Sequence, residues 1–390
     1  MSEWKEYKLG EIADVQTVPF GSQLHMSDYQ NEGTPIITVE HLGDNRIIHN
    51  NLPLVGDDDK NRLRKYVLSE GDIVFSRVGS VDRRAYVSAK EDGWMFSGRC
   101  LRVRPSQKAD AKFLSYYFGL EDFKETIRRI AVGATMPSIN TTILSNVVVP
   151  LPPLDTQRRI AAILSSLDDK IDLLHRENAT LEQMAETLFR QWFVEEVKED
   201  WEEGTVADLV EFNPTRKLVK GTIAPFLEMS NLSTSTYAPT YWYNRAFSSG
   251  SKFQNGDTLL ARITPCLENG KTAYVDFLNE NQVGWGSTEF IVMHSKLGIH
   301  SFFSYVIAKY QDFRDYAESC MSGSSGRQRV DVDNLKNYPI NIPDKITIVQ
   351  FNNEIETMVS KMNNNNKQIQ TLIQTRGELL EKLMSNEINI

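Results

Sequence analysis

The most regular hydrophobic pattern in this chain occupies two segments, one near its middle and one at its end. Between Ile160 and Trp192, and again between Ile348 and Leu383, apolar residues recur at spacings that alternate between four and three. This heptad pattern is typical of helices that pack along one another. We therefore predict two long helices, in residues 151–196 and 346–390, that form a coiled coil. Two separate surface helices on one core are the alternative.

Each apolar seam contains an asparagine, and together these two residues predict how the helices match. Asn178 occupies an a position of the heptad and Asn365 a d position. In an antiparallel pair a layers face d layers, so that Asn178 opposite Asn365 also places Ile160 opposite Leu383. A buried asparagine layer can specify the register of such helices. We predict an intramolecular antiparallel coiled coil in which Asn178 meets Asn365.

The rest of the chain shows shorter patterns that are typical of mixed β and α structure. Gly71-Asp72 and Gly256-Asp257 each precede a short apolar run, which indicates a turn followed by a strand. At residues 101–104 apolar side chains alternate with arginine, which predicts a half-buried strand with a basic outer face. Helical patterns follow around residues 113–130 and 302–318. The predicted fold class is α+β.

The chain also contains an internal duplication. Gly71–Arg77 is similar to Gly256–Arg262, and Phe113–Tyr116 is similar to Phe302–Tyr305. The offset stays at roughly 190 residues along the chain, which indicates a repeat. We predict two globular domains in tandem, residues 1–150 (module 1) and residues 197–345 (module 2), each followed by one of the long helices.

Composition narrows the class of protein but does not by itself indicate a DNA-binding protein. The 390 residues carry a net charge of −9, and the three cysteines lie far apart. We expect no disulfide framework, no transmembrane span and no secretory signal, and hence a reducing cytoplasm. Neither module is basic overall, so contact with DNA requires local clusters of basic residues or a more basic partner.

Three strings of residues resemble one protein family. Gly256–Lys271 looks like a stretch that is frequent in the target-recognition domains of type I restriction–modification specificity subunits. Gly133–Asn140 looks like their Gly-Ser-Thr-x-Pro-x-Ile loop, and Leu151–Ile160 looks like the entry to their central helix. The alternation of module and long helix resembles the same subunits over essentially the whole chain.

The resemblance implies a role in DNA recognition. Each module would read one half of a bipartite site in double-stranded DNA, and the helices would set the gap. Two methylation subunits would dock on the helices and carry the catalytic residues and S-adenosylmethionine, and restriction subunits can join them. The chain itself would need no cofactor. The modules differ where Arg99 aligns with Glu289, and Met136-Pro137 with Gly326-Arg327, so the two half-sites are expected to differ.

Candidate DNA contacts follow from the chemistry of phosphates and base edges. Arg and Lys bind phosphates, whereas Arg, Asn, Gln, Ser and Thr bind base edges. In module 1 the candidates are Arg77, Arg83, Arg84, Arg102, Thr135 and Asn140. In module 2 they are Arg262, Thr264, Lys271, Ser324, Arg327, Gln328 and Arg329. A solvated surface residue is the alternative at each position, and the bases that are read do not follow from the sequence.

The absence of catalytic motifs argues against an enzyme. The Asn/Asp-Pro-Pro-Tyr/Phe cluster of adenine methyltransferases is missing, as is a G-x-G-x-x-G turn. Asn269–Thr272 is similar to the end of a phosphate-binding loop, but Pro265 stands where that loop needs glycine. The six histidines lack ligand spacing, so no metal is predicted. Two alternatives remain: a specificity-like subunit of another phage-defence system, and a coiled-coil adaptor that binds no DNA.

Overall fold

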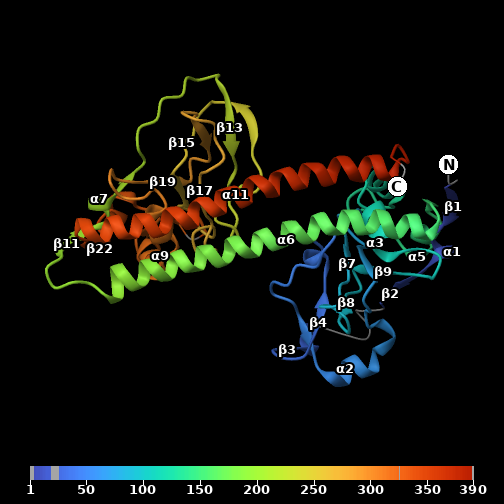
Figure 1. Ribbon diagram of the computed structural model, residues 1–390. Helices are drawn as coiled ribbons and strands as arrows, with labels where there is room; N and C mark the ends of the chain where they lie inside the picture. The colour runs from blue at the N-terminus through green and yellow to red at the C-terminus, as the bar shows by residue number, and fades with distance from the viewer. Residues whose placement is uncertain (1–3, 19–25, 325, 389–390) are drawn as a thin grey trace. The chain divides into compact units, whose positions relative to one another are not determined.

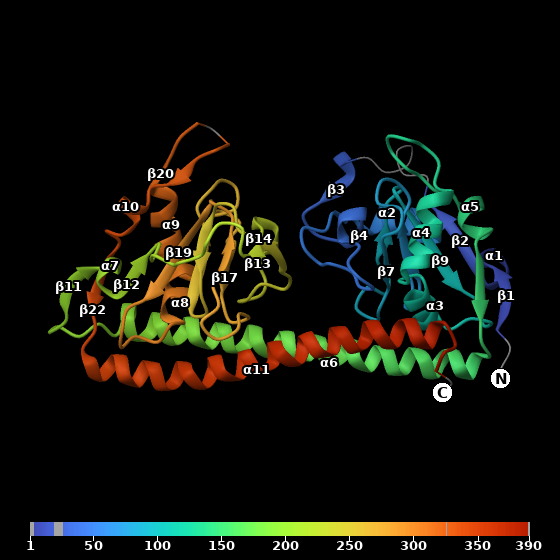
Figure 2. The same cartoon turned by 90° about the horizontal axis from the view of Figure 1, so that it is seen from above.

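The computed structural model describes residues 4–18, 26–324 and 326–388, which form two compact units (Figure 1). Unit 1 contains residues 1–170 and 372–390, and unit 2 contains residues 171–371. Each unit therefore combines one module with one end of each long helix. Within each unit the helix ends run along one side of the module (Figure 2).

Unit 1 is built on three sheets. The largest is antiparallel, with the order β2 (Ala13–Thr17), β9 (Cys100–Pro105), β6 (Ile73–Ser76), β7 (Arg84–Tyr86). The second is mixed, with the order β3 (Tyr29–Gln30), β5 (Leu54–Val55), β4 (Thr34–Ile37), β8 (Met95–Phe96), and its β4–β8 pair is parallel. The third pairs β1 (Lys5–Lys8) with β10 (Val148–Leu151).

Short helices complete module 1. They are α1 (Leu9–Ile12), α2 (Asp57–Arg62), α3 (Ala111–Tyr117), α4 (Glu121–Ile130) and α5 (Thr141–Ser145), with 3-10 turns at Met26–Asp28, Val39–His41 and Arg64–Tyr66. The single helical pattern predicted at residues 113–130 is thus two helices. The chain turns at Gly119, where a Cβ atom would lie 2.1 Å from the Arg84 guanidinium, so the break makes room for that buried side chain.

Unit 2 repeats the antiparallel sheet of unit 1, while its mixed sheet has a different edge strand and a further strand pair is present. The antiparallel sheet has the order β12 (Val210–Phe212), β19 (Phe290–Ser295), β16 (Asp257–Ala261), β17 (Thr272–Tyr274). The mixed sheet has the order β14 (Tyr243–Ala246), β13 (Ile223–Leu227), β18 (Gly284–Gly286), β15 (Ser251–Phe253), with β13 and β18 parallel. Two further pairs are β11 (Glu202–Thr205) with β22 (Pro339–Ile342), and β20 (Met321–Ser322) with β21 (Arg329–Val330).

Among the described residues, the helices of module 2 follow those of module 1 except that α2 has no counterpart. They are α7 (Val206–Leu209), α8 (Phe303–Lys309), α9 (Gln311–Ser319) and α10 (Val332–Leu335), with a 3-10 turn at Met229–Asn231. The helical pattern predicted at residues 302–318 is again two helices, because Tyr310 is extended between α8 and α9. The predicted duplication is therefore present in the strand order of the antiparallel sheets and in the parallel pairs β4–β8 and β13–β18. The mixed sheets differ at their edges, because β3 pairs with β5 in unit 1, whereas β15 pairs with β18 in unit 2.

The two long helices are α6 (Leu154–Arg190), which continues into a π-helical turn at Gln191–Glu195, and α11 (Lys345–Met384). In unit 2, Asn365 Nδ2 donates to Asn178 Oδ1 at 2.9 Å, and the rings of Trp192 and Phe351 lie 6.4 Å apart. These contacts make the helices antiparallel within unit 2, in the register that the asparagines predict. In unit 1, Ile160 and Leu383 lie in one core.

One local prediction is wrong. The alternation at residues 101–104 predicted a strand with a basic outer face, but Cys100, Leu101, Arg102 and Val103 of β9 are all buried. The reason is that β9 is an inner strand between β2 and β6 whose residues pack into two cores, Leu101 and Val103 into one and Cys100 into the other. Arg102 is accommodated there by an ion pair with Asp14.

Candidate nucleic-acid interface

In unit 2 the glycine-flanked loop at residues 322–329 lies beside the end of strand β16. The Arg262 N–H donates to the Glu289 carbonyl at 3.0 Å, and the Val330 N–H donates to the Arg262 carbonyl at 2.9 Å. The Thr264 N–H donates to the Gln328 carbonyl at 3.1 Å. The backbone therefore brings the predicted loop and the predicted strand end together. Residue 325 of this loop lies outside the described residues.

Unit 1 uses the same backbone arrangement. The Arg77 N–H donates to the Arg99 carbonyl at 2.8 Å, and the Ile139 N–H donates to the Arg77 carbonyl at 3.0 Å. The Gly79 N–H donates to the Pro137 carbonyl at 2.8 Å. Each unit thus brings three parts together in equivalent positions: the residue after one strand, the residue before the neighbouring strand, and a loop. We call this arrangement the reading face. It contains Arg77, Arg99 and the loop before Ile139 in unit 1, and Arg262, Glu289 and the loop before Val330 in unit 2.

The backbone also corrects one alignment. The sequence placed Met136-Pro137 opposite Gly326-Arg327, but the bonds of Pro137 correspond to those of Gln328. The bridges Val78–Ser138 and Ile263–Arg329 extend this correspondence by one residue. Sequence similarity is too weak in these loops to fix the alignment, whereas a strand bridge fixes it residue by residue.

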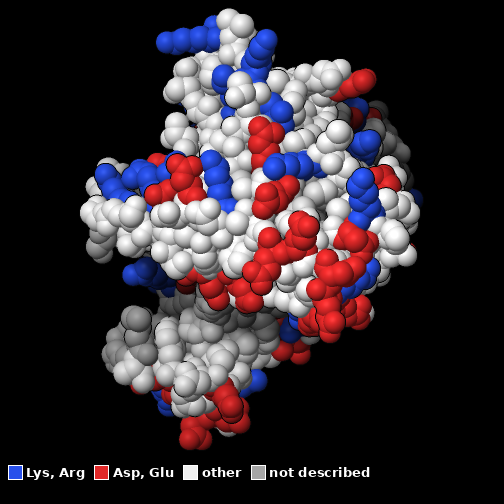
Figure 3. Space-filling view, turned by 90° about the vertical axis from the view of Figure 1, so that its left-hand side faces the viewer, with Lys and Arg blue, Asp and Glu red and all other residues white. Residues whose placement is uncertain are grey.

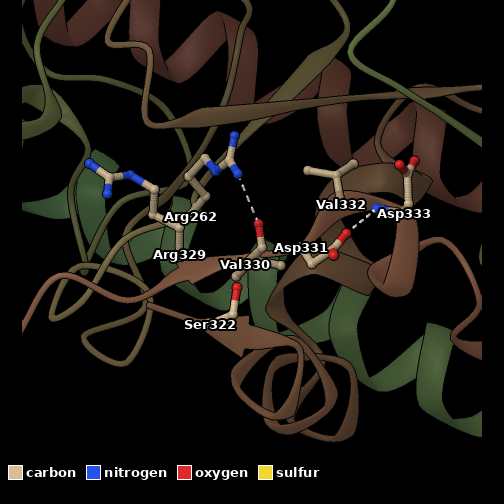
Figure 4. Close-up of a pocket in the computed structure, with 7 residues that line it drawn as sticks. All are labelled: Arg262, Ser322, Arg329, Val330, Asp331, Val332 and Asp333. Atoms are coloured by element: carbon tan, nitrogen blue, oxygen red, sulfur yellow. Dashed lines mark hydrogen bonds between the residues drawn. The ribbon is translucent and has the colours of Figure 1, made fainter. Parts of the chain in front are cut away.

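Side chains of unit 2 line an open pocket of about 500 Å³ at the reading face (Figure 4). Arg262 and Arg329 lie at one end of the pocket, and Asp331 and Asp333 at the other. The Arg262 guanidinium donates to the Val330 carbonyl at 3.1 Å, and Asp331 caps helix α10 by accepting from the Asp333 N–H at 2.9 Å. The pocket therefore offers cationic donors only at its arginine end.

Arg329 is held by a carboxylate. Its Nε lies 3.0 Å from both carboxylate oxygens of Glu289, and its Nη2 donates to Oε1 at 2.7 Å. These hydrogen bonds lower the pKa of Glu289 and raise the pKa of Arg329, so the pair is fully ionised at neutral pH. The planar guanidinium suits this two-pronged contact and keeps other N–H groups available.

The remaining candidates of module 2 differ in accessibility. Ser324 and Arg327 are exposed, Gln328 is half-buried, and Arg327 has no side-chain partner among the residues that the structure describes. Lys271 Nζ donates to the Met229 carbonyl at 3.0 Å, and Thr264 is half-buried. Arg327 is thus the candidate whose charge is most open to a ligand.

In module 1 the candidate arginines Arg77 and Arg83 are also engaged with backbone carbonyls. The Arg77 guanidinium donates to the Gly98 carbonyl at 3.2 Å, and Arg83 donates to the Leu42 carbonyl, yet both side chains stay partly exposed. Thr135 is exposed in its loop. Asn140 is exposed and caps helix α5 by accepting from the Ile143 N–H at 2.8 Å, so it has a structural role already.

Arg84 and Arg102 do not belong to the reading face, contrary to the sequence-based assignment. Each of these two residues is 4% exposed. Arg84 donates to the buried Ser115 carbonyl at 2.9 Å and pairs with Asp44 at 3.2 Å, while Arg102 pairs with Asp14. A charge can be buried only when it is paired and hydrogen-bonded, and these two arginines meet that condition inside the fold.

The sequence-based candidates omitted several residues that the structure brings to the reading faces or to the asparagine layer. Arg99 and Glu289 stand at the reading faces, and their difference was visible in the aligned repeats. Asn366 extends the asparagine layer, because Asn178 Nδ2 donates to its Oδ1 at 3.1 Å and its own Nδ2 donates to the Tyr237 hydroxyl at 2.7 Å. The run of asparagines at residues 363–366 was the available signal for this contact.

Charge is distributed in patches of both signs. On the face that Figure 3 presents, Lys and Arg alternate with groups of Asp and Glu and do not merge into one basic surface. This agrees with the near balance of charge in both modules.

Across the described part of the chain, no three His, Cys, Asp or Glu side chains are arranged to hold a metal ion. In the same residues, a helix with the length and apolar character of a membrane span is not found.

Comparisons with known proteins agree with this geometry. The family model of the type I restriction modification DNA specificity domain matches residues 1–183 and again residues 198–375. The type I restriction enzyme MjaIX specificity subunit of Methanocaldococcus jannaschii is 22% identical over 425 residues, which cover 99% of this chain and 94% of that protein. The MjaVIII specificity subunit of the same organism is 26% identical over 194 residues, which cover 46% of this chain and only 43% of that protein.

A solved structure shares the fold. The crystal structure of the type I restriction–modification system S subunit from M. genitalium matches with a TM-score of 0.57 at 16% identity, covering 97% of this chain and 96% of that one. Two tandem domains of mixed helix and sheet content are thus common to both. Because the family model matches both halves of the chain, this protein belongs to the family of type I restriction modification DNA specificity domains.

Proposed function

We propose that this chain is the DNA-recognition subunit of a type I restriction–modification complex. Module 1, residues 1–150, would read one half of a bipartite site in double-stranded DNA, and module 2, residues 197–345, would read the other. The observation that carries the proposal is the reading face, which occurs twice with equivalent backbone bonds and different side chains. A repeated scaffold with varied side chains suits two different half-sites.

The contacts that we propose with DNA are the accessible candidates at the two reading faces. They are Arg77, Arg83, Thr135 and Asn140 in module 1, and Arg262, Thr264, Lys271, Ser324, Arg327, Gln328 and Arg329 in module 2. The local groups of arginine supply attraction to phosphate in a chain whose net charge is negative. Because neither module is basic overall, we infer that a more basic partner binds the DNA together with this chain.

The long helices have a separate role in this proposal. Residues 151–196 and 346–390 would form an antiparallel coiled coil that sets the gap between the half-sites and docks two methylation subunits. The heptad pattern of both helices and the Asn178–Asn365 contact support it. Those subunits would bind S-adenosylmethionine and carry out adenine methylation, and restriction subunits would join the same complex. This chain would contribute positioning and no catalytic group.

The test is co-expression with the methylation subunit from the same locus, followed by long-read detection of methylated adenine in host DNA. We expect one bipartite motif. Exchange of residues 1–150 for those of a relative should change one half of the motif, and exchange of residues 197–345 should change the other half. A stable complex without methylation would instead favour a coiled-coil adaptor, and no complex at all would contradict the docking role of the helices.

A further inference from the structure

One position at the reading face carries opposite charges in the two units. Arg99 directly precedes strand β9, and Glu289 directly precedes strand β19. Both carbonyls accept the N–H of the arginine that follows the neighbouring strand, Arg77 at 2.8 Å and Arg262 at 3.0 Å. The equivalence of Arg99 and Glu289 therefore rests on backbone geometry, and the two differ only in what their side chains offer.

In unit 2 this position presents hydrogen-bond acceptors beside donors. Glu289 is 22% exposed and Arg329 is 45% exposed, so both side chains reach the surface. A carboxylate has about four acceptor sites, of which Arg329 occupies only part, and the guanidinium keeps N–H groups that Glu289 does not use. Because the pair has no net charge, the carboxylate can approach DNA with less repulsion from phosphates.

In unit 1 the same position presents donors only. The Arg99 side chain is exposed, and its guanidinium has no partner among the residues described in unit 1. Ser138 stands where Arg329 does, as the strand bridges show. A free guanidinium has five N–H donors in a fixed fork and no acceptor. The two reading faces thus have opposite hydrogen-bonding character at one equivalent place.

We propose that Arg99 and Glu289 are specificity-determining residues, each reading one G·C pair in the major groove. Arg99 donates to O6 and N7 of a guanine in the first half-site. Glu289 accepts from the N4 amino group of a cytosine in the second half-site, and Arg329 donates to the guanine paired with that cytosine. This inference rests on the proposed function, since it names the bases that the two modules read.

The first experiment compares methylation motifs. The chain is co-expressed with its methylation subunit, and host DNA is sequenced for the unmodified protein and for Arg99→Gln and Glu289→Gln. We expect Arg99→Gln to relax one guanine position in one half of the motif. We expect Glu289→Gln to relax one cytosine position in the other half. Arg129→Gln and Glu211→Gln, which change exposed residues of the same two modules, are the matched controls and should leave the motif intact.

A second experiment needs no substitution, so loss of folding cannot obscure it. The unmodified complex is bound to duplexes that carry 7-deazaguanine at the first position, which removes N7, or N4-methylcytosine at the second, which blocks the amino group. We expect each change to weaken binding by roughly 5- to 150-fold, the range for one lost base contact. The same analogues placed in the gap between the half-sites should have no effect.

The outcomes separate this inference from the function on which it rests. If the unmodified complex methylates no bipartite motif, the proposed function fails. If it methylates a motif in which either half lacks a G·C pair, the function stands and the inference is overturned. Unchanged motifs in both substituted proteins, or equal binding to the modified and unmodified duplexes, would overturn it as well.

Discussion

At the scale of single residues, two pairs of arginine side chains in this protein have opposite surroundings. Arg84 and Arg102 are buried and hold ion pairs inside module 1. Arg99 and Arg327 are exposed and have no side-chain partner among the described residues. Only the second group can exchange water for phosphate or base contacts at little cost, because the first would have to break contacts of the fold.

Arg327→Ala should therefore weaken DNA binding without affecting stability. Loss of one phosphate contact reduces the slope of log affinity against log salt by about one. We expect the thermal unfolding temperature to stay unchanged, because the Arg327 side chain has no partner to lose among the residues that the structure describes. The measurement is binding of the complex to its duplex at several salt concentrations, with Arg129→Ala as the control. An unchanged salt slope would remove Arg327 from the proposed contacts.

Arg84→Met should have the reverse effect. The buried Ser115 carbonyl would lose its donor, which costs about 1–3 kcal/mol of unfolding free energy. The methionine side chain would fill most of the space that the arginine methylene groups occupy. Denaturant unfolding would measure this loss. The methylation motif should keep both halves, since Arg84 lies away from the reading face. A stable variant with a relaxed motif would show that Arg84 reads DNA after all.

At the scale of elements, the contact between the long helices and module 2 is polar as well as apolar. Asn365 donates to Asn178, Asn178 donates to Asn366, and Asn366 donates to the Tyr237 hydroxyl at 2.7 Å. That hydroxyl donates to the carboxylate of Asp276 at 2.7 Å. A chain of hydrogen bonds thus links the helix register to the position of the module, since each member orients the next.

The asparagine layer can be tested by a double-mutant cycle. Asn178→Leu alone should lower the unfolding free energy by about 1–3 kcal/mol, because the buried Asn365 amide loses its acceptor. The double variant Asn178→Leu, Asn365→Leu should recover stability through an apolar layer, but it should form mixed oligomers because the register is no longer specified. Calorimetry and light scattering measure these effects. If the double variant lost as much unfolding free energy as the two single variants together, the two asparagines would not be coupled.

Asp276 predicts a pH dependence of stability. Burial of its carboxyl raises the pKa of Asp276 above the ordinary value of 3.8, despite the hydrogen bonds from Tyr237 and Asn366. Between 3.8 and the raised value the folded state holds a proton that the unfolded state has released. This group therefore stabilises the fold at low pH, and that contribution is lost as pH rises through the window.

Replacement by the neutral amide isolates this effect. Asp276→Asn keeps an acceptor for the Tyr237 hydroxyl and removes the charge, so we expect it to be more stable than the unmodified protein at pH 7. The difference should shrink on acidification toward pH 4. Denaturant unfolding across this range measures it, with Asp333→Asn, an exposed carboxylate, for comparison. A difference that grows on acidification would contradict the raised pKa.

At the scale of the whole molecule, helix length is the variable that the proposed function depends on. Insertion of one heptad into both α6 and α11, next to the asparagine layer, would keep their seams matched and lengthen the pair by about 10 Å. We expect the gap in the methylated motif to grow by about three base pairs with both half-sites unchanged. A heptad in only one helix should instead destabilise the protein, and an unchanged gap in the doubly extended protein would contradict the spacer role.

Much of the architecture was predictable because its signals are local and repeated. A heptad pattern over many turns allows one helix geometry, so the long helices and the meeting of Asn178 with Asn365 followed from periodicity. Likewise the duplication could be recognised from matched strings such as Gly71–Arg77 and Gly256–Arg262. The antiparallel sheets of the two modules share one strand order, whereas their mixed sheets differ in the edge strands.

The sequence by itself thus determined the α+β class, the tandem repeat and the helix register, since each depends on the spacing of residue types along the chain. The tertiary structure alone decided which arginines are buried, because exposure depends on what packs across a strand, as at Arg102 between β2 and β6. It also decided that Ser138 corresponds to Arg329, and its backbone bonds support the match of Arg99 with Glu289 that the aligned repeats had indicated. Such pairings depend on backbone bonds between segments far apart in sequence, which no local pattern records.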